Sequence, residues 1–270
     1  IGIDDNFFDL GGHSLKATTL MTLIHKRLKV KIPLVNLFEM PTVREQAAYM
    51  NRIAESLYSP ILPGEEREYY DLSYAQRRLW IICRLEENSI TYNIVGLFDI
   101  TGPLEVTAFE RTIRTLVDRH ESFRTVFINL GGHPKQKILG NYQYIQEVED
   151  LGTLGGSEKA GKTRQIMERG ANTSFHLEKG PLFLFQLIRQ EEEKFILLVN
   201  IHHLIADGTS IGILIKEFTS LYGGVELPLL QLQYKEYTRW QNSAANLEKI
   251  KNQEPYWLEQ FAGEIPRLRL

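Results

Sequence analysis

Two adjacent histidines stand at the end of an apolar segment, in a pattern that could carry acid–base chemistry. His202 and His203 complete the apolar run of residues 195–201, and Asp207 and Gly208 follow a few residues later. The run has the length and composition of a buried strand, and the apolar residues beyond Gly208 recur at helical spacing. A strand that ends just before a helix begins places polar side chains at the edge of a cleft. An imidazole in such a cleft can exchange a proton near neutral pH.

A serine behind two glycines is the second group that could carry chemistry. Ser14 follows Gly11 and Gly12 and begins a segment whose apolar residues have helical spacing. A lone serine in this place is most often the N-cap of the helix. It is also open to a modifying enzyme, and a phosphate on it would lie beside free N–H groups at the positive end of the helix dipole. Ser14 is therefore either a cap or a modification site.

Composition limits the class of protein. The chain has 270 residues, 43% of them hydrophobic, and a formal net charge of −3, which gives no reason to expect binding to nucleic acid or to an anionic membrane. No apolar run is long enough to cross a bilayer, and the N-terminus lacks the layout of a signal peptide. Cys83 is the only cysteine, which excludes an internal disulfide and suits a reducing cytoplasm, where we expect the protein to act. Its apolar neighbours predict a buried packing residue.

The first part of the chain reads as a small helical domain. Residues 14–28 and the segment after Pro41 have helical periodicity, and residues 34–38 between them read as a short apolar turn. Thr42 is a natural N-cap, with Glu45 three residues on to complete a capping box.

The rest of the chain mixes strands and helices. We expect helices at 106–117 and 211–222, a strand at 122–130, a hairpin of strands at 182–189 and 195–201, and a mobile surface loop at 150–163. This alternation predicts a layered α/β fold.

These motifs together resemble a known multidomain enzyme. The string Asp-Leu-Gly-Gly-His-Ser-Leu at 9–15 resembles the prosthetic-group site of a peptidyl carrier protein. His-His-x-x-x-Asp-Gly at 202–208 resembles the signature of a condensation domain of nonribosomal peptide synthetases, in the chloramphenicol acetyltransferase-like superfamily. Three further blocks resemble that domain in the family's order, at 72–80, 119–127 and 233–240.

The resemblance implies a domain plan. We expect a small all-α carrier bundle at 1–55 whose first helix is missing, a linker at 56–68, and at 69–270 a two-layer α/β chloramphenicol acetyltransferase-like lobe with a mixed sheet. This lobe is the N-terminal part of a condensation domain, and the C-terminal lobe is absent from the sequence. We therefore expect the isolated chain to be inactive.

The resemblance also implies roles for individual residues. Ser14 is expected to carry 4'-phosphopantetheine. His203 is the candidate base or positioning group when an acceptor amine attacks a donor thioester, and His202 is expected to face the opposite side of the strand and pack. Asp207 is expected to be structural and to pair with an arginine, either Arg124 or one outside this sequence. Gly208, listed with these candidates, is expected to keep the channel open where the two arms meet.

Partners follow from the same resemblance. We expect an upstream adenylation domain, downstream carrier and adenylation domains, a phosphopantetheinyl transferase, and aminoacyl or peptidyl thioesters as substrates. His13, in Gly-Gly-His-Ser, favours a donor residue that is passed on without epimerisation. The remaining histidines have no ligand spacing, so we predict no metal.

Two other functions stay open. An epimerisation domain shares the histidine motif, and degenerate relatives serve as non-catalytic docking platforms for partner enzymes. The block at 75–80 and His13 favour condensation over epimerisation, while intact His203 and Asp207 argue against a platform. A heterocyclisation domain would carry an aspartate in place of His202, and we reject that alternative.

Overall fold

The computed structural model describes residues 1–270 except 53–59, 87–88, 141, 143, 145–146 and 264–270. The chain separates into two compact units, residues 1–60 and 61–270, which are described here one at a time. In the described part of the chain, no helix combines the length and the apolarity that a membrane span needs.

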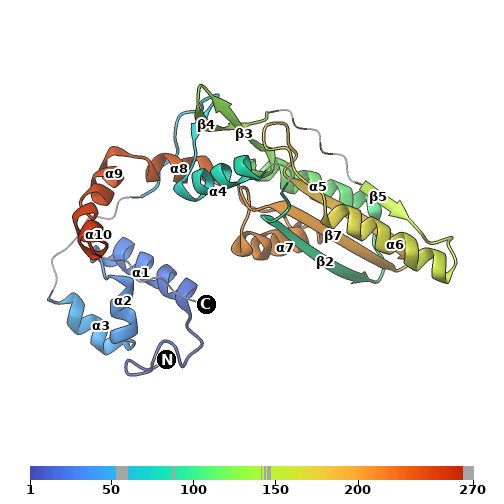
Figure 1. Cartoon of the computed structure of the whole chain (residues 1–270). Coiled ribbons are helices and arrows are strands. Elements are labelled where there is room, and N and C mark those ends of the chain that lie inside the picture. Colours follow the sequence, from blue (N-terminus) through green and yellow to red (C-terminus); the bar gives the residue numbers. More distant parts are fainter. Residues whose placement is uncertain (53–59, 87–88, 141, 143, 145–146, 264–270) are drawn as a thin grey trace. The chain divides into compact units, whose positions relative to one another are not determined.

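The first unit is a set of helices around a small apolar core (Figure 1). Its helices are α1 (Ser14–Leu28), α2 (Leu34–Glu39) and α3 (Val43–Met50). The segment predicted as a short apolar turn is thus the helix α2, which buries Leu37 completely. The capping box at the start of α3 is confirmed, because Thr42 accepts from the Glu45 N–H and the Glu45 carboxylate accepts from the Thr42 N–H.

The second unit combines two sheets with helices. In chain order its elements are β1 (Tyr70–Asp71), α4 (Tyr74–Leu85), β2 (Asn93–Thr101), α5 (Val106–Arg119), the 3₁₀ helix η1 (Glu121–Arg124), β3 (Thr125–Leu130), β4 (His133–Ile138), β5 (Glu147–Asp150), α6 (Gly156–Ala171), β6 (Phe183–Glu191), β7 (Lys194–His202), α7 (Gly208–Tyr222), α8 (Tyr234–Gln241), α9 (Ala244–Lys251) and α10 (Glu254–Gln260).

A four-stranded mixed sheet organises this unit. Its order is β2-β7-β6-β5, with β2, β7 and β6 antiparallel and β5 parallel to β6. The predicted hairpin is confirmed as β6 and β7, which are joined by a tight turn at residues 192–193. A second, three-stranded sheet has the order β1-β4-β3.

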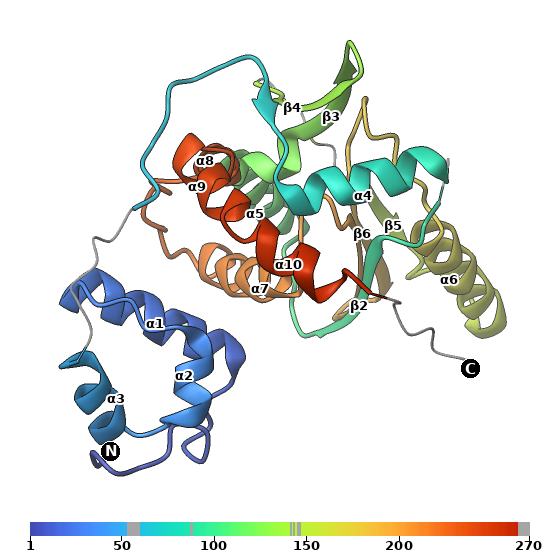
Figure 2. The same cartoon turned by 60° about the vertical axis from the view of Figure 1, so that its left-hand side comes forward.

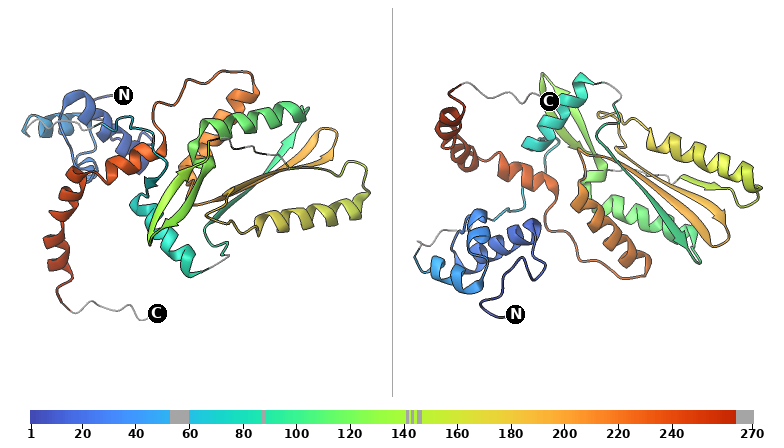
Figure 3. Two further views of the ribbon diagram at one scale, coloured as in Figure 1. Left: turned by 90° about the horizontal axis from the view of Figure 1, so that it is seen from above. Right: turned by 60° about the horizontal axis from the view of Figure 1, so that its bottom comes forward.

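Helices cover both faces of the mixed sheet. Figure 3 shows the sheet edge-on, with α5 on one side and α6 on the other. The face under α5 and α7 carries the larger core, in which Phe109 and Ile113 of α5 meet Phe185 and Val199 of the sheet. On the other face Ile166 of α6 packs against β6.

Two predicted segments are wrong in detail. Most of the mobile loop expected at 150–163 is the first half of α6. We did not predict this helix because its sequence is largely polar and only Ile166 and Gly170 are buried. Gly170 near the end of this helix allows close packing, since a Cβ there would lie 2.9 Å from Leu198. The strand expected from residue 122 begins only at Thr125, because residues 121–124 form the 3₁₀ helix η1.

The start of α4 is tied to α8, which lies beside it (Figure 2). Ser73 caps α4 through the Gln76 N–H, and its hydroxyl also contacts the Tyr234 hydroxyl at 3.0 Å. Gln241 accepts the N–H of Tyr74 at 2.8 Å. The blocks at 72–80 and 233–240 thus hold each other in place, next to the segment that follows β7.

Candidate active site and carrier site

The pairing of β7 with β2 places the side chains of His202 and His203 on opposite sides of the end of β7. His202 is the last residue of β7 and lies opposite Asn93 of β2 in the ladder. The pairing continues one step further, since the His203 N–H donates to the Tyr92 carbonyl at 2.8 Å. Successive side chains of a strand alternate between its faces, so the two imidazoles point to different environments.

His202 lies in the buried environment. It is 3% exposed, and its Nδ1 accepts the Leu204 N–H at 3.1 Å. Burial, together with the neighbouring His203, lowers the pKa of His202 to about 4, so the ring is neutral at physiological pH. With Nδ1 acting as acceptor, the proton resides on Nε2, which faces the Cys83 sulfur at 3.7 Å. Burial raises the pKa of the Cys83 thiol, which makes this half-buried cysteine a poor nucleophile.

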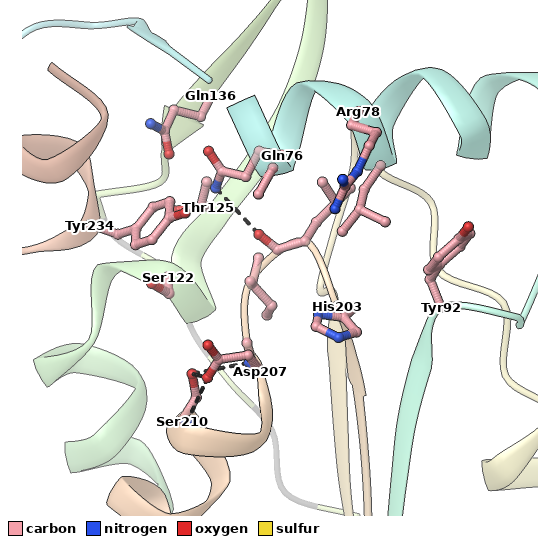
Figure 4. Close-up of a pocket in the computed structure, with 15 residues that line it drawn as sticks. Gln76, Arg78, Tyr92, Ser122, Thr125, Gln136, His203, Asp207, Ser210 and Tyr234 are labelled. Atoms are coloured by element: carbon pink, nitrogen blue, oxygen red, sulfur yellow. Dashed lines mark hydrogen bonds between the residues drawn. The ribbon is translucent and has the colours of Figure 1, made fainter. Parts of the chain in front are cut away.

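His203 lies in an open cleft of about 410 Å³ (Figure 4). The residue is exposed, and among the residues that the structure describes its ring has no hydrogen-bond partner. Both ring nitrogens are therefore available to a ligand. The cleft is lined by Ala75, Gln76, Arg78, Leu79, Tyr92, Ser122, Thr125, Gln136, His203, Leu204, Ile205, Ala206, Asp207, Ser210 and Tyr234.

Asp207 is the N-cap of α7. Its carboxylate accepts from the Ser210 N–H at 2.8 Å and from the Ser210 hydroxyl at 2.7 Å, while the Ser210 Oγ accepts the Asp207 N–H at 3.0 Å. Burial acts to raise the pKa of Asp207, but the hydrogen bonds from Ser210 and the nearby His203 outweigh it and leave the pKa below its usual value. The residue is exposed at the cleft and charged at neutral pH.

The predicted pair of Asp207 with Arg124 is wrong. The Arg124 guanidinium donates to three backbone carbonyls instead, those of Leu139 at 2.7 Å, Asp118 at 3.2 Å and Val117 at 3.3 Å. Arg124 therefore joins the end of α5 to the end of β4. These carbonyls satisfy the guanidinium, which would be costly to leave unpaired beside an apolar strand. The sequence pattern could not reveal them.

Gly208 is the first residue of α7 and stands in open space. A Cβ built there meets no atom within 4 Å, and its backbone is not in the left-handed region. Neither packing nor backbone strain in this structure requires a glycine at this position.

Sequence reasoning missed several residues of the cleft. Gln76 and Tyr234 come from the blocks at 72–80 and 233–240, to which we gave no role in the site, and both line the cleft. The Gln76 side-chain amide also donates to the Leu204 carbonyl at 3.3 Å, one residue beyond His203. Ser210, the capping partner of Asp207, also lines it, and the capping-box spacing from Asp207 was the signal that could have found it.

Ser14 is the first residue of α1, and the N-cap is His13, whose side chain makes no capping bond. The simple reading of Ser14 as the N-cap is thus wrong. Ser14 is exposed, and no acidic residue lies in the first turn of α1. Its side chain is free for modification, at a helix end whose N–H groups favour a phosphate.

The glycines before Ser14 have separate structural reasons. Gly11 has a φ of 82°, in the left-handed region that favours glycine. A Cβ on Gly12 would lie 2.4 Å from the Phe7 ring. The loop can therefore turn tightly against Phe7 and present Ser14 outward, so these residues fit a serine-linked phosphopantetheine.

Metal ligands do not gather at either site. Within the described ranges, no group of three or more histidine, cysteine, aspartate or glutamate side chains could hold a metal ion.

Comparisons with known proteins match each part of the chain to a family. Residues 66–270 match the condensation domain family, and residues 1–50 match the phosphopantetheine attachment site family. The chain is 39% identical over 269 residues to bacitracin synthase 3 of Bacillus licheniformis, covering 100% of this chain and 4% of that protein. It is 40% identical over 269 residues to surfactin synthase subunit 1 of Bacillus subtilis (strain 168), covering 100% of this chain and 7% of that protein. The chain thus spans a small part of these relatives.

Solved structures share the fold. The starter condensation domain of rhizomide synthetase RzmA superposes with a TM-score of 0.63 at 23% identity, covering 74% of this chain and 49% of that chain. The X-domain in complex with OxyB from teicoplanin biosynthesis gives a TM-score of 0.68 at 21% identity, covering 78% of this chain and 47% of that chain. At such identities the likeness establishes the fold alone.

Proposed function

Because the chain belongs to the condensation domain family and carries a phosphopantetheine attachment site, we propose that it forms peptide bonds in nonribosomal peptide synthesis. The amine of an acceptor residue attacks the thioester carbonyl of a donor residue. The new bond joins the amine nitrogen to the carbonyl carbon, and the carbon–sulfur bond breaks. The amine loses a proton, and the departing sulfur ends as a thiol.

The observation that carries this proposal is the state of His203. Its imidazole lies in an open cleft at the end of β7 and has no hydrogen-bond partner within the described part of the chain, while the adjacent His202 is buried and neutral. We assign to His203 the holding of the amine and the acceptance of its proton. General-base help of this kind gives roughly 10²–10⁴-fold in rate. Holding the two reactants together contributes ~7–11 kcal/mol in favourable cases.

The other candidate residues support this geometry. Asp207 fixes the start of α7 and Gly208 leaves space beside it, so the cleft keeps an open edge. Ser14 is the residue that we propose to carry the phosphopantetheine. That group supplies a flexible arm ending in a thiol, which holds the acyl residue as a thioester.

We further propose a setting for the reaction. The donor is passed on without epimerisation, as His13 suggests, and a phosphopantetheinyl transferase modifies Ser14. Adenylation and carrier domains of the same synthetase are the expected partners, in the cytoplasm. The solved structures above are about twice as long as the parts that this chain matches, so we expect 1–270 alone to be inactive and the activity test belongs in a synthetase that contains it.

Two other functions make different products. An epimerisation domain would remove and return a Cα proton, and a docking platform would do no chemistry. The fold does not separate condensation from a docking role, because the teicoplanin X-domain, solved in complex with OxyB, superposes as well as the starter condensation domain. We favour condensation over a platform because His203 and Asp207 both line the cleft, and over epimerisation because of the block at 75–80 and His13.

The test is to load both carriers of a synthetase that contains this chain and to analyse the thioesters by mass spectrometry and chiral chromatography. A dipeptide thioester with an unchanged donor is expected. A scrambled donor without elongation would indicate epimerisation, and neither product would indicate a platform.

The attachment site has its own test in the chain 1–270. A phosphopantetheinyl transferase and coenzyme A should add one arm to the wild type and none to Ser14→Ala, as read by intact mass. Thr18→Ala, one turn further along α1, is the matched control and should be loaded normally. Loading of Ser14→Ala would contradict the assignment.

A further inference from the structure

Two hydroxyl groups meet where the start of α4 touches α8. The Ser73 Oγ and the Tyr234 Oη lie 3.0 Å apart, so one of them donates a hydrogen bond to the other. Ser73 is completely buried, whereas Tyr234 is 38% exposed and lines the cleft of His203. The direction of this bond therefore decides whether the cleft contains a free O–H donor.

The direction follows from the donors and acceptors around Ser73. A serine hydroxyl has one proton to donate and two lone pairs that accept. The Ser73 Oγ accepts the Gln76 N–H at 3.2 Å, so its own proton still needs an acceptor. In the described ranges, the Tyr234 Oη is the acceptor within reach of that proton. Because buried hydroxyls are rarely left without a partner, Ser73 donates and Tyr234 accepts.

The proton of Tyr234 is then available in the cleft. The Tyr234 hydroxyl has no second partner among the residues that the structure describes. Burial raises the pKa of Tyr234, so the phenol keeps its proton at neutral pH. Figure 4 shows Tyr234 across the cleft from Tyr92. A neutral donor, fixed by a buried serine, thus faces the space that His203 lines.

Neighbouring polar side chains of the cleft donate their protons within the protein. The Thr125 hydroxyl donates to the Glu121 carbonyl at 2.8 Å. The side-chain amide of Gln136 donates to the Asp71 carbonyl at 2.8 Å and to the Thr238 hydroxyl at 3.1 Å. The tyrosine hydroxyl differs from both, because its proton has no acceptor in the part of the chain that is described.

We propose that Tyr234 donates a hydrogen bond to a carbonyl oxygen of the acyl substrate in this cleft. The inference rests on the proposed function, which brings a thioester and the residue attached to it beside His203. Thioester and amide carbonyl oxygens accept hydrogen bonds and cannot donate them, so they match this donor. At the thioester, the same hydrogen bond stabilises the negative charge that the oxygen gains when the amine attacks.

Isotope-edited infrared spectroscopy of a synthetase that contains this chain tests the contact. The donor carrier is loaded with an N-acetyl-aminoacyl group that has a carbon-13 label at the thioester carbonyl or at the acetyl carbonyl, and the acceptor carrier is left empty. A hydrogen bond lowers the stretching frequency of a carbonyl, so Tyr234→Phe should raise the frequency of one labelled band. The label that responds identifies the oxygen. No change in either band would overturn the proposal.

The single-turnover rate of peptide-bond formation also separates the two oxygens. Loss of a donor to the thioester oxygen should lower the rate of Tyr234→Phe by roughly 10²–10³-fold. Loss of a donor to the amide oxygen should lower it by roughly two- to tenfold. An unchanged rate would overturn this inference alone, whereas a wild-type synthetase that forms no dipeptide would refute the proposed function.

A matched control comes from the same helix. The Tyr237 hydroxyl accepts from the Gln241 side-chain amide at 2.9 Å, and Tyr237 is not among the residues that line the cleft. Tyr237→Phe should therefore leave both bands and the rate unchanged. Equal effects of Tyr237→Phe and Tyr234→Phe would contradict a specific contact.

A double variant separates substrate contact from a structural role. Tyr234→Phe leaves the buried Ser73 proton without its acceptor, which could disturb the start of α4. Combining Ser73→Ala with Tyr234→Phe removes both hydroxyls, so no proton is left unpaired. We expect the rate and the labelled band to stay as in Tyr234→Phe. Recovery of either toward wild type would show that Tyr234 acts only by holding Ser73, and would overturn the proposal.

Discussion

The two sides of the β7 end use the same side chain for different purposes. On the buried side, the His202 imidazole is neutral, accepts one backbone N–H and packs near Phe175, with ring centroids 6.3 Å apart. On the open side, the His203 imidazole lines a cleft of about 410 Å³. The difference shows that the surroundings, and not the residue type, decide which histidine is available for chemistry.

The burial of His202 should make the free energy of unfolding depend on pH. The folded pKa of His202 is about 4 against an ordinary value of 6.5. As the pH falls from 6.5 to 4, the unfolded chain binds a proton at His202 that the folded chain does not, so the contribution of His202 to stability should fall by roughly 3 kcal/mol and level off below pH 4. Urea unfolding of wild type and His202→Gln over this range measures it. An equal pH slope in the two proteins would show that His202 is not the buried neutral group.

Arg124 should matter for folding through the carbonyls that it joins. Arg124→Ala leaves the carbonyls of Leu139, Asp118 and Val117 without this donor. We expect the free energy of unfolding to fall by about 2 kcal/mol, because hydrogen bonds from a charged group are among the stronger ones. A double-mutant cycle with Asp207→Ala should be additive within about 0.5 kcal/mol, since the two side chains do not touch. A coupling energy well above about 0.5 kcal/mol would show that Asp207 and Arg124 interact, as we predicted from the sequence.

Asp207 on the open side should have a smaller effect. Asp207→Ala removes the N-cap of α7 and should destabilise the fold by about 1 kcal/mol, while Asp207→Asn keeps a capping oxygen and should be nearly neutral. Chemical unfolding gives both values. If Asp207→Asn is folded like wild type yet inactive, the carboxylate has a chemical role beyond the cap.

Gly208 should have the smallest effect on stability. A Cβ there meets nothing within 4 Å, so we expect Gly208→Ala to change the free energy of unfolding by less than about 0.5 kcal/mol. Its transfer activity should nevertheless fall if the substrate arms pass this point. Unchanged turnover would show that the space beside Gly208 is not used.

Local patterns predicted much of the fold. The capping box at Thr42, the hairpin of β6 and β7 and the helix after the histidines follow from signals within a few residues of each other. The helix α6 could not be predicted from such local signals, because its sequence is polar and only Ile166 and Gly170 are buried. Polar composition alone thus concealed a helix that the sheet stabilises.

The site was predictable only in part. Strand alternation was enough to separate His202 from His203. The partners of Arg124 were not predictable, because they are backbone carbonyls at positions set by the packing of α5 and β4. Gln76 and Tyr234 lie more than 100 residues apart in sequence from each other and meet the cleft only through the contact of α4 with α8.

The most direct test of the account is the single-turnover rate of peptide-bond formation in a synthetase that contains this chain, for wild type and His203→Ala. The exposed position of His203 predicts an unfolding free energy within about 0.5 kcal/mol of wild type. Its role at the cleft predicts a rate lower by roughly 10²–10⁴-fold. A stable variant that loses only a few-fold in rate would contradict proton transfer by His203 as the main source of catalysis.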